Sequence, residues 1–159
     1  MNLPNYFLAD LPPDATLNAA MITEACQTLK RNREKYLATR STHGLVELLC
    51  HVAERWLEPT YPFRKLALQS GPTATGFSSA TLASGLDAFF RQLTPEQFQA
   101  LLTQDLGHAK RLDEIVATNA EEKFRRGAIA VGPELLAHVT AGNIPNPTLV
   151  AIVLGVLTR

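Results

Sequence analysis

The chain has 159 residues, of which 46% are hydrophobic and 19% are charged. This balance is typical of an ordinary globular protein of about one domain, and it excludes a disordered or fibrous chain. Fifteen Lys and Arg residues match fifteen Asp and Glu residues, so the formal net charge is zero. A chain without a net positive field does not attract phosphates in general, which argues against nucleic acid or an acidic membrane as its main partner.

The two cysteines and the first residues of the chain bear on its location. Cys26 and Cys50 are too few for a disulfide scaffold and lack the spacing of a metal-binding pair. Residues 1–14 contain no Lys or Arg and no long apolar run, unlike a signal or transit peptide. We therefore expect a reducing, cytoplasmic location.

The first two-thirds of the chain predicts a series of amphipathic helices. Apolar residues at steps of three and four predict a first helix from a cap at Asp14 to about Tyr36, with a basic outer face. A second helix is expected to begin at Thr42. It should end at Glu58, because Pro59 disfavours helical geometry in the residue before it.

Turn and capping residues divide the next helices. Pro62 suits the first turn of a short third helix, and the sequence Ser-Gly-Pro at 70–72 predicts a turn. Ser78 is a candidate cap for a fourth helix. Residues 94–97, Thr-Pro-Glu-Gln, predict a capped helix start, and that fifth helix should stop at Gly107.

The pattern changes after this helix. Residues 108–126 are polar and weakly periodic, which indicates a helical connector or linker. Residues 128–131 and 135–140 are short apolar runs separated by Gly132 and Pro133, and they predict buried strands.

A last helix is predicted over Leu149 to Leu157, with Asn146 as its cap and Pro147 at its first position. Apart from Gly155 it is apolar on every side, so it must be buried on several sides. It is shorter than a membrane-spanning helix, which needs about 20 apolar residues. A strand, a loop and such a helix resemble the opening of a βαβ unit that lacks its second strand.

These patterns define an expected fold class and domain organisation. We expect a mainly α N-terminal region over residues 1–107, a connector over 108–126, and the start of an α/β domain over 127–159. The last part would be the first strand-helix unit of an incomplete domain, so the chain is expected to be a piece of a larger protein.

Asn143 lies in the loop after the last predicted strand, where ligands collect in open α/β sheets. Its side-chain amide offers donors that can stabilise a developing oxyanion. The alternative is structural: Asn143 tolerates a left-handed turn conformation, while Gly142 and Pro145 shape the bend.

Three segments carry a resemblance to a known family. Residues 135–145, Leu-Leu-Ala-His-Val-Thr-Ala-Gly-Asn-Ile-Pro, within 128–157, resemble the acyl-CoA reductase family, which includes the reductase subunit of the fatty-acid reductase complex of luminous bacteria. Residues 56–64 and 75–78 are also similar to the N-terminal region of that family. No single motif is diagnostic, but their order and spacing agree over most of the chain.

The resemblance implies an activity and an aldehyde dehydrogenase-like fold, in which residues 127–159 would begin a Rossmann-like nucleotide-binding α/β domain. The superfamily carries a Pro-Trp-Asn-x-Pro loop, which Asn143 and Pro145 match, while Ala141 and Gly142 replace its proline and tryptophan. By resemblance, Asn143 would hold the substrate carbonyl oxygen, and the Ala141-Gly142 backbone would run near the nicotinamide.

The implied reaction is NADPH-dependent reduction of a fatty acyl thioester, carried on CoA or a protein, to an aldehyde. It would proceed through a catalytic cysteine that lies downstream in this family. Cys26 and Cys50 match no such nucleophile, so the fragment itself is expected to be inactive. The full-length protein is expected to form a homo-oligomer, with partner subunits of a fatty-acid reductase complex as further candidates.

The remaining candidate sites have ordinary structural explanations beside the functional ones. Glu47, His51 and Glu54 share one helical face with metal-ligand spacing, but such spacing is common on surfaces, and we predict no metal site. A basic stretch is a candidate for CoA phosphates or an acidic partner, or else a solvated face; it comprises Lys30, Arg31, Arg33, Lys35 and Arg40. His138 lies in an apolar run and is predicted to be a core histidine rather than a catalytic base.

Two other classes of function remain open. The chain could be a complete helical protein-interaction module whose apolar C-terminal helix docks on a partner. More weakly, residues 149–157 could attach it peripherally to a membrane. We expect no transmembrane segment and no nucleic-acid partner.

Overall fold

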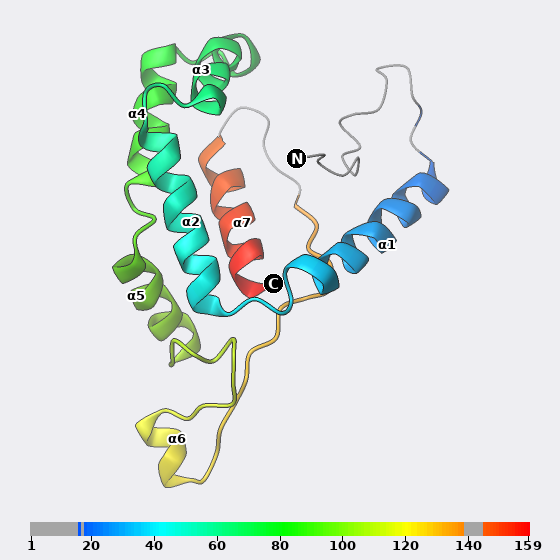
Figure 1. Cartoon of the computed structure of the whole chain (residues 1–159), viewed down its shortest axis with the longest axis vertical. Coiled ribbons are helices and arrows are strands. Elements are labelled where there is room, and N and C mark those ends of the chain that lie inside the picture. The colour runs from blue at the N-terminus through cyan, green and yellow to red at the C-terminus, as the bar shows by residue number, and fades with distance from the viewer. Residues whose placement is uncertain (1–15, 17, 139–144) are drawn as a thin grey trace.

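The computed structural model describes residues 16, 18–138 and 145–159. Seven helices occur in these described residues: α1 (Ala19–Tyr36), α2 (Thr42–Leu57), α3 (Pro62–Thr75), α4 (Ser79–Phe90), α5 (Pro95–Leu106), α6 (Asn119–Lys123) and α7 (Pro145–Thr158). Helix α2 packs against α4, α5 and α7, and α3 packs across one end of α4, whereas α1 extends away from this group (Figure 1). The predicted mainly helical character of the N-terminal region is confirmed.

Polar side chains begin the helices where the sequence predicts them. Ser41 caps α2 by accepting a hydrogen bond from the Gly44 N–H at 3.1 Å. Ser78 caps α4 in the same way, and Thr94 accepts from the Gln97 N–H at the start of α5. Each oxygen satisfies a backbone donor that the first helical turn leaves free. The predicted starts of the second, fourth and fifth helices are therefore confirmed.

Helix α1 begins later than predicted and contributes little to the core. Asn18 caps it by accepting from the Met21 N–H at 3.0 Å, and the predicted cap Asp14 lies outside the described residues. None of the side chains in α1 is buried, and Ile22 and Leu29 are each nearly half exposed. Its apolar stripe is thus mostly uncovered by the described part of the chain.

The turn predicted at residues 70–72 is wrong, because α3 continues through Pro72 to Thr75. Pro72 has no N–H to donate to the carbonyl of Leu68, four residues before it. The hydroxyl of Ser79, at the start of α4, donates to that carbonyl instead, at 3.0 Å. A partner from the next helix therefore replaces the bond that proline removes, and the helix ends at Gly76, whose φ is 78°.

Two apolar clusters form the core. The larger one joins α2, α5 and α7 through buried residues that include Leu49, Phe98 and Leu157. The smaller one joins α2 and α4 through Ala53, Leu86 and Phe90, and Leu93 packs against both clusters. Burial of these side chains supplies most of the driving force for folding.

Arg64 is a buried charge that links three helices. Its side chain, on α3, is 8% exposed and contacts the Asp87 carboxylate of α4 at 2.7 Å. It also donates to the carbonyl of Trp56 on α2 at 3.0 Å. A buried guanidinium is tolerated only when its donors have partners, so this site fixes the position of α3.

The predicted strands at 128–131 and 135–140 are not formed in the part of the chain that the structure describes. A single antiparallel bridge joins Val116 and Ala128, and the Ala130 N–H donates to the Arg111 carbonyl at 2.7 Å. Beyond this point the chain contacts helices instead, because Gly132 lies against the end of α7 and Glu134 pairs with Lys30. A strand needs a neighbouring backbone along its length, and residues 111–116 supply too short a partner. Residues 139 and 140 lie outside the described range.

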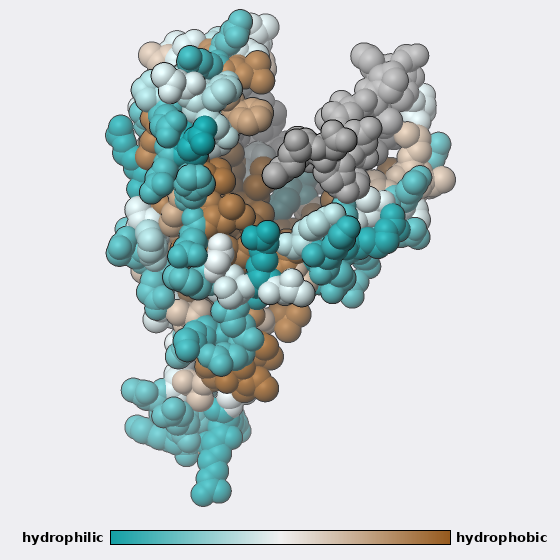
Figure 2. Space-filling view, in the orientation of Figure 1, coloured by the Kyte–Doolittle hydropathy of each residue, from teal (hydrophilic) through white to brown (hydrophobic). Residues whose placement is uncertain are grey.

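The predicted apolar C-terminal helix is confirmed as α7, with a start at Pro145 rather than Pro147. It packs on α2 and α4, with Leu157 2% exposed and Ile152 53% exposed. Other helices, rather than a sheet, therefore cover its buried face. Exposed apolar side chains also occur at Ile129 and Val131, and Figure 2 shows apolar surface between the main group of helices and the end that carries α6.

Among the described residues, no helix combines the length and the apolar character required to cross a lipid bilayer.

Candidate functional site

The three residues predicted to act on substrate and cofactor, Asn143, Ala141 and Gly142, lie outside the described residues. The structure describes both flanks of this loop, which end at residue 138 and resume at α7. Asn146, in the first turn of α7, faces Gly85 of α4: a methyl group on Gly85 would lie 3.9 Å from the Asn146 Oδ1. The helical region therefore fixes the residues that follow the loop.

His138 does not occupy the core position predicted for it. It is exposed, and its Nε2 lies near Gly155 of α7. A methyl group on Gly155 would be 3.9 Å from this nitrogen, which is an ordinary van der Waals distance. Leu136 approaches the same glycine more closely. The prediction of a core histidine is wrong because residues 135–138 lie along a helix instead of inside a sheet.

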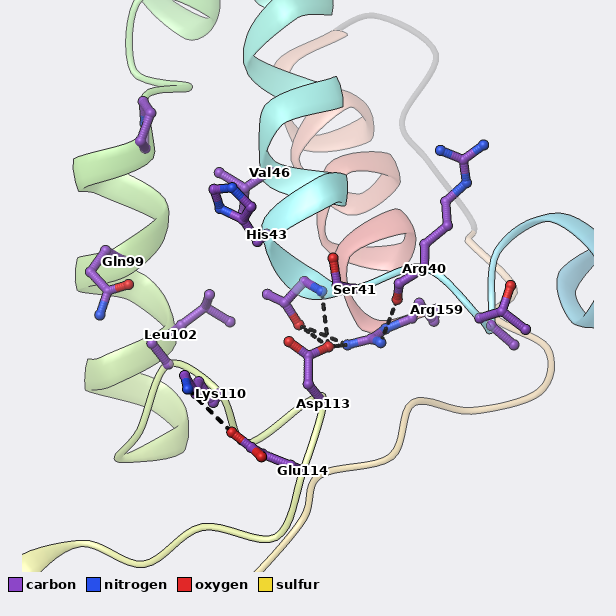
Figure 3. A pocket seen from close by; sticks show the side chains of 15 residues that line it. Arg40, Ser41, His43, Val46, Gln99, Leu102, Lys110, Asp113, Glu114 and Arg159 are labelled. Carbon is purple, nitrogen blue, oxygen red and sulfur yellow. Dashed lines mark hydrogen bonds and ion pairs between the residues drawn. The ribbon is translucent and has the colours of Figure 1, made fainter.

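A pocket of about 810 Å³ opens between the N-terminus of α2, helix α5 and the turn at 108–114. Most of the residues that line it are polar or charged, and Figure 3 shows the Asp113 and Arg159 side chains pointing toward each other at one end of it. Lys110 and Glu114 lie beside them, on the turn.

Asp113 is the centre of the hydrogen bonding in this pocket. Its Oδ1 accepts from the Thr42 N–H and the Thr42 hydroxyl, both at 2.9 Å, and from Arg159 Nη2 at 2.8 Å. Burial opposes ionisation of the carboxyl group, but the bonds from Thr42 and Arg159 outweigh it and hold the pKa of Asp113 below its usual value. The carboxylate also lies at the N-terminus of α2, where the helix dipole favours a negative charge.

Arg159 connects this carboxylate to the end of α7. Its guanidinium donates to the carbonyl of Arg40 at 2.7 Å and to the carbonyl of Leu112 at 2.9 Å. It also donates to the Thr42 hydroxyl at 2.7 Å, and its side chain is only 10% exposed. One planar cation thus joins α7, the α1–α2 junction and the turn after α5.

The other charged groups that line the pocket also have partners within the described chain. Lys110 Nζ is 3.4 Å from Glu114, and His43 Nε2 is 3.3 Å from Glu47. Arg40 Nε donates to the carbonyl of Tyr36 at 2.9 Å. An arrangement in which the charges satisfy one another is suited to holding chain segments together rather than to catalysing a reaction.

Cys50 does not have the environment of a nucleophile. Cys26 and Cys50 are free thiols of intermediate exposure, and Cys50 packs against the larger core cluster. Burial, with smaller contributions from Glu54 and Glu96, raises the pKa of the Cys50 thiol. A thiol with a raised pKa is less often the reactive thiolate, which agrees with the structural role expected from the sequence.

The possible metal ligands on α2 are separated into ion pairs. His51 lies 3.7 Å from Glu54, whereas Glu47 lies beside His43. Within the described ranges, no group of three or more His, Cys, Asp or Glu side chains is placed to hold a metal ion.

The basic stretch of α1 is largely engaged within the chain. Lys30 pairs with Glu134 at 2.8 Å, which raises the pKa of Lys30 through a hydrogen bond and the nearby charge. Arg33 contacts Glu34 and donates to the Arg159 main-chain oxygen. Lys35 lies over the ring of Tyr36. The contacts of Lys30 and Arg33 hold α1 against the end of α7 and against residues 129–138, which we call the extended segment.

Sequence reasoning did not identify Asp113 and Arg159. Asp113 lies in the polar connector, where one carboxylate among many charges gives no periodic signal. Arg159 gives only a weak sequence signal: it is a basic residue directly after the predicted last helix, where a cation complements the helix dipole. Their pairing joins residues 46 positions apart, and only the tertiary structure defines it.

Comparison with known proteins identifies the family. A model of the acyl-CoA reductase (LuxC) family matches residues 37–159, which include every helix from α2 to α7. No curated protein and no solved structure matches the chain. Because the match covers well over half of the sequence, the chain belongs to the acyl-CoA reductase family.

Proposed function

We propose that this chain is part of an enzyme that reduces fatty acyl thioesters to aldehydes with NADPH. The observation that carries the proposal is the match to the acyl-CoA reductase family over residues 37–159. The reaction converts the thioester to an aldehyde and a free thiol. A cysteine supplied from outside residues 1–159 would first take the acyl group as a thioester of its own, because Cys50 packs against the core and Cys26, on α1, matches no nucleophile motif of the family.

In this proposal Asn143 donates a hydrogen bond to the substrate carbonyl oxygen as negative charge develops there. Ala141 and Gly142 would supply the backbone beside the nicotinamide. What supports this role is the anchoring of α7, which follows Asn143 in the chain: its first turn faces Gly85, and Leu149 packs against the smaller core cluster. A donor has to be held before the reaction to lower the barrier.

The described residues do not by themselves form a dinucleotide site. Pro145 and Pro147 stand in the first turn of α7, and neither has an N–H to offer to a phosphate. The cations nearest the end of α7 are already engaged, as Arg159 shows. We therefore propose that NADPH is held mainly by other parts of the enzyme.

We also propose the domain organisation that the sequence predicts. Residues 1–107 would be the helical region, 108–126 the connector, and 127–159 the first strand-helix unit of a Rossmann-like domain. Residues 128–131 would become a strand when a neighbouring strand is supplied. We also propose a homo-oligomer in the cytoplasm, with partner subunits of a fatty-acid reductase complex and acyl-CoA or acyl-protein thioesters as substrates.

The test measures NADPH-dependent aldehyde formation from an acyl-CoA. The 159-residue chain should form no aldehyde. If the gene continues beyond codon 159, the longer polypeptide that it encodes should be active. In the active protein, Asn143→Ala should lower kcat much more than it raises KM. Asn119→Ala, at an exposed position on α6, is the matched control and should leave kcat nearly unchanged. Full activity of Asn143→Ala would remove the role assigned to Asn143, and an inactive extended protein would contradict the proposed reaction.

A second candidate function is a helical interaction module that docks through α7. The observation that favours it is the exposure of Val150, Ile152 and Leu154 on this helix. In that case the 159-residue chain should unfold cooperatively and show one defined mass by analytical ultracentrifugation. A gene that encodes no further residues would favour this candidate over the reductase.

A further inference from the structure

A short apolar groove lies between the end of α4, one face of α5 and one face of α7. Its walls include Phe89, Phe98, Leu101, Val150, Val153 and Leu154, and its volume is about 220 Å³. Phe98 is buried and belongs to the larger core cluster, so the floor of the groove is fixed by packing. Val150 and Leu154 are 44% and 39% exposed, which leaves the groove open to a ligand.

The lining of the groove restricts the chemistry of its occupant. All the described residues that line it are uncharged, and its polar members are the amide side chains Gln92 and Gln97. A charged ligand group would lose water here without gaining a partner of opposite charge. An alkyl chain, in contrast, exchanges water for apolar walls and gains free energy.

The dimensions favour a single narrow chain over a protein segment. The lining residues of α7 are Val150, Val153 and Leu154, and the five helical positions that they cover span about 6 Å. A docked partner helix normally uses apolar anchors spread over about two turns. The volume also falls below the range of about 300–1,000 Å³ for pockets that enclose drug-sized ligands.

We propose that this groove binds the alkyl chain of a fatty acyl thioester. The inference rests on the proposed function for the choice of an acyl ligand, and on the groove for its position. Such a site would give the enzyme a preference for chain length, because each methylene that enters the groove removes further apolar surface from water.

The chain contains its own reporter for binding. Trp56 is the single tryptophan in the sequence, and it stacks on Phe90 with ring centroids 5.1 Å apart. Phe90 in turn contacts the edge of Phe89, which lines the groove. Occupation of the groove should therefore change the fluorescence of Trp56, and calorimetry gives an independent measure of affinity.

The first experiment titrates the 159-residue chain with octanoyl-CoA, octanoate and free CoA. Octanoyl-CoA and octanoate should both bind, and free CoA should not. From butanoate to octanoate, the affinity should rise by about fourfold per methylene and then level off as the groove fills. Equal binding of CoA and octanoyl-CoA, or an affinity that does not depend on chain length, would overturn the proposal.

The second experiment compares two variants of α7. Val150→Glu places a carboxylate in the groove and should weaken octanoate binding by about tenfold or more. Ile152→Glu is the matched control, because Ile152 is 53% exposed on the same helix but does not line the groove. Its affinity should stay within about twofold of wild type, as expected for a solvated surface position. An equal loss in both variants would contradict the proposal.

Leu101→Ala provides a test that does not introduce a charge. Removal of this side chain enlarges the groove, so the affinity should level off at longer acyl chains than in wild type. An unchanged preference would count against the groove. Sedimentation of the same proteins tests the other possible occupant, a second copy of the chain. If wild type forms a dimer that Val150→Glu dissociates, and wild type does not bind octanoate, the groove is a dimer interface and the proposal is wrong.

The results for the groove and for the reductase are separable. Octanoate binding that Val150→Glu abolishes, in a protein without reductase activity, supports the groove and not the reaction. An active reductase whose preference for chain length is unchanged by Val150→Glu supports the reaction and overturns the groove.

Discussion

Arg159 Nη2 lies 2.8 Å from the Asp113 Oδ1, and through this contact the end of α7 is joined to the start of α2. Asp113 accepts from the first residue of α2, Thr42, while Arg159 directly follows the last turn of α7. The two helices run in opposite directions, so their ends of opposite dipole meet here (Figure 1). The ion pair therefore lies where both partial charges favour it.

Replacement of Asp113 should destabilise the fold. Asp113→Ala leaves the nearly buried guanidinium of Arg159 without its carboxylate and removes the partner of the Thr42 N–H. We expect a loss of about 2 kcal/mol in the free energy of unfolding, measured by urea denaturation. Asp105→Asn on α5 is the control, because Asp105 is exposed, and it should change stability by less than about 0.5 kcal/mol. Equal effects of the two substitutions would show that the Asp113 contacts add nothing.

The pH dependence of stability should depend on Glu121. Hydrogen bonds from the Thr118 backbone, from Arg111 and from the Thr118 hydroxyl lower the pKa of Glu121 from 4.5 to about 2. Because the folded pKa lies below the unfolded one, the stabilisation is complete above about pH 4.5 and is lost as the pH falls toward 2. Asp113 shifts in the same direction.

The Tm of wild type should thus fall more steeply with acidification than that of Glu121→Gln, which keeps the shape but has no carboxyl group to protonate. Glu24→Gln, on the exposed side of α1, should follow the wild-type curve. A Tm profile of Glu121→Gln that coincides with wild type between about pH 5 and 2 would contradict this assignment.

The bond from Ser79 to the carbonyl of Leu68 predicts a measurable coupling with Pro72. Ser79→Ala should lower the free energy of unfolding by about 1 kcal/mol, because the carbonyl loses its donor. In a Pro72→Ala background, residue 72 regains an N–H for the same carbonyl, and the loss should be smaller by about 0.5–1 kcal/mol. A double-mutant cycle measures this difference, and strict additivity would argue that the Ser79 bond does not compensate for Pro72.

Two glycines should respond in opposite ways to replacement by alanine. A methyl group on Gly132 would lie 2.3 Å from the carbonyl oxygen of Thr158, so Gly132→Ala has to push the extended segment away from α7. We expect a loss of about 1–3 kcal/mol. A methyl group on Gly85, inside α4, would meet nothing closer than 3.9 Å, and Gly85→Ala should gain up to about 1 kcal/mol from helix propensity. Thermal unfolding of both variants measures these changes in stability. A stabilising effect of Gly132→Ala would refute the close contact.

The sequence alone predicts most helix boundaries, because capping and termination are local. Ser78, Thr94 and Gly107 act within one turn of their own positions, and the structure has them where the pattern places them. The turn predicted at Ser70–Pro72 fails because the compensating donor, Ser79, comes from a different helix. Local chemistry indicates that Pro72 removes a bond, but it does not indicate that another helix replaces it.

The strands predicted at 128–131 and 135–140 are not formed in the described residues, and the cause is again non-local. The apolar run at 128–131 has the composition of a strand, but a strand also needs a partner backbone. In the described structure this partner is limited to Val116, which bridges Ala128, and Arg111, whose carbonyl accepts from the Ala130 N–H, and the following residues pack on helices instead. Composition fixes which residues avoid water and leaves open which surface covers them.

The same division applies to the site. The residues of the Asn143 loop and their resemblance to acyl-CoA reductases are properties of the sequence, and the family match agrees with them. The joining of Asp113 to Arg159 and the groove beside α7 bring together residues from distant segments. Sequence thus determines the family and the local helices, because caps, prolines and motifs act over a few residues. Tertiary structure decides which charges pair and which apolar faces stay open, because both depend on the packing of helices far apart in the chain.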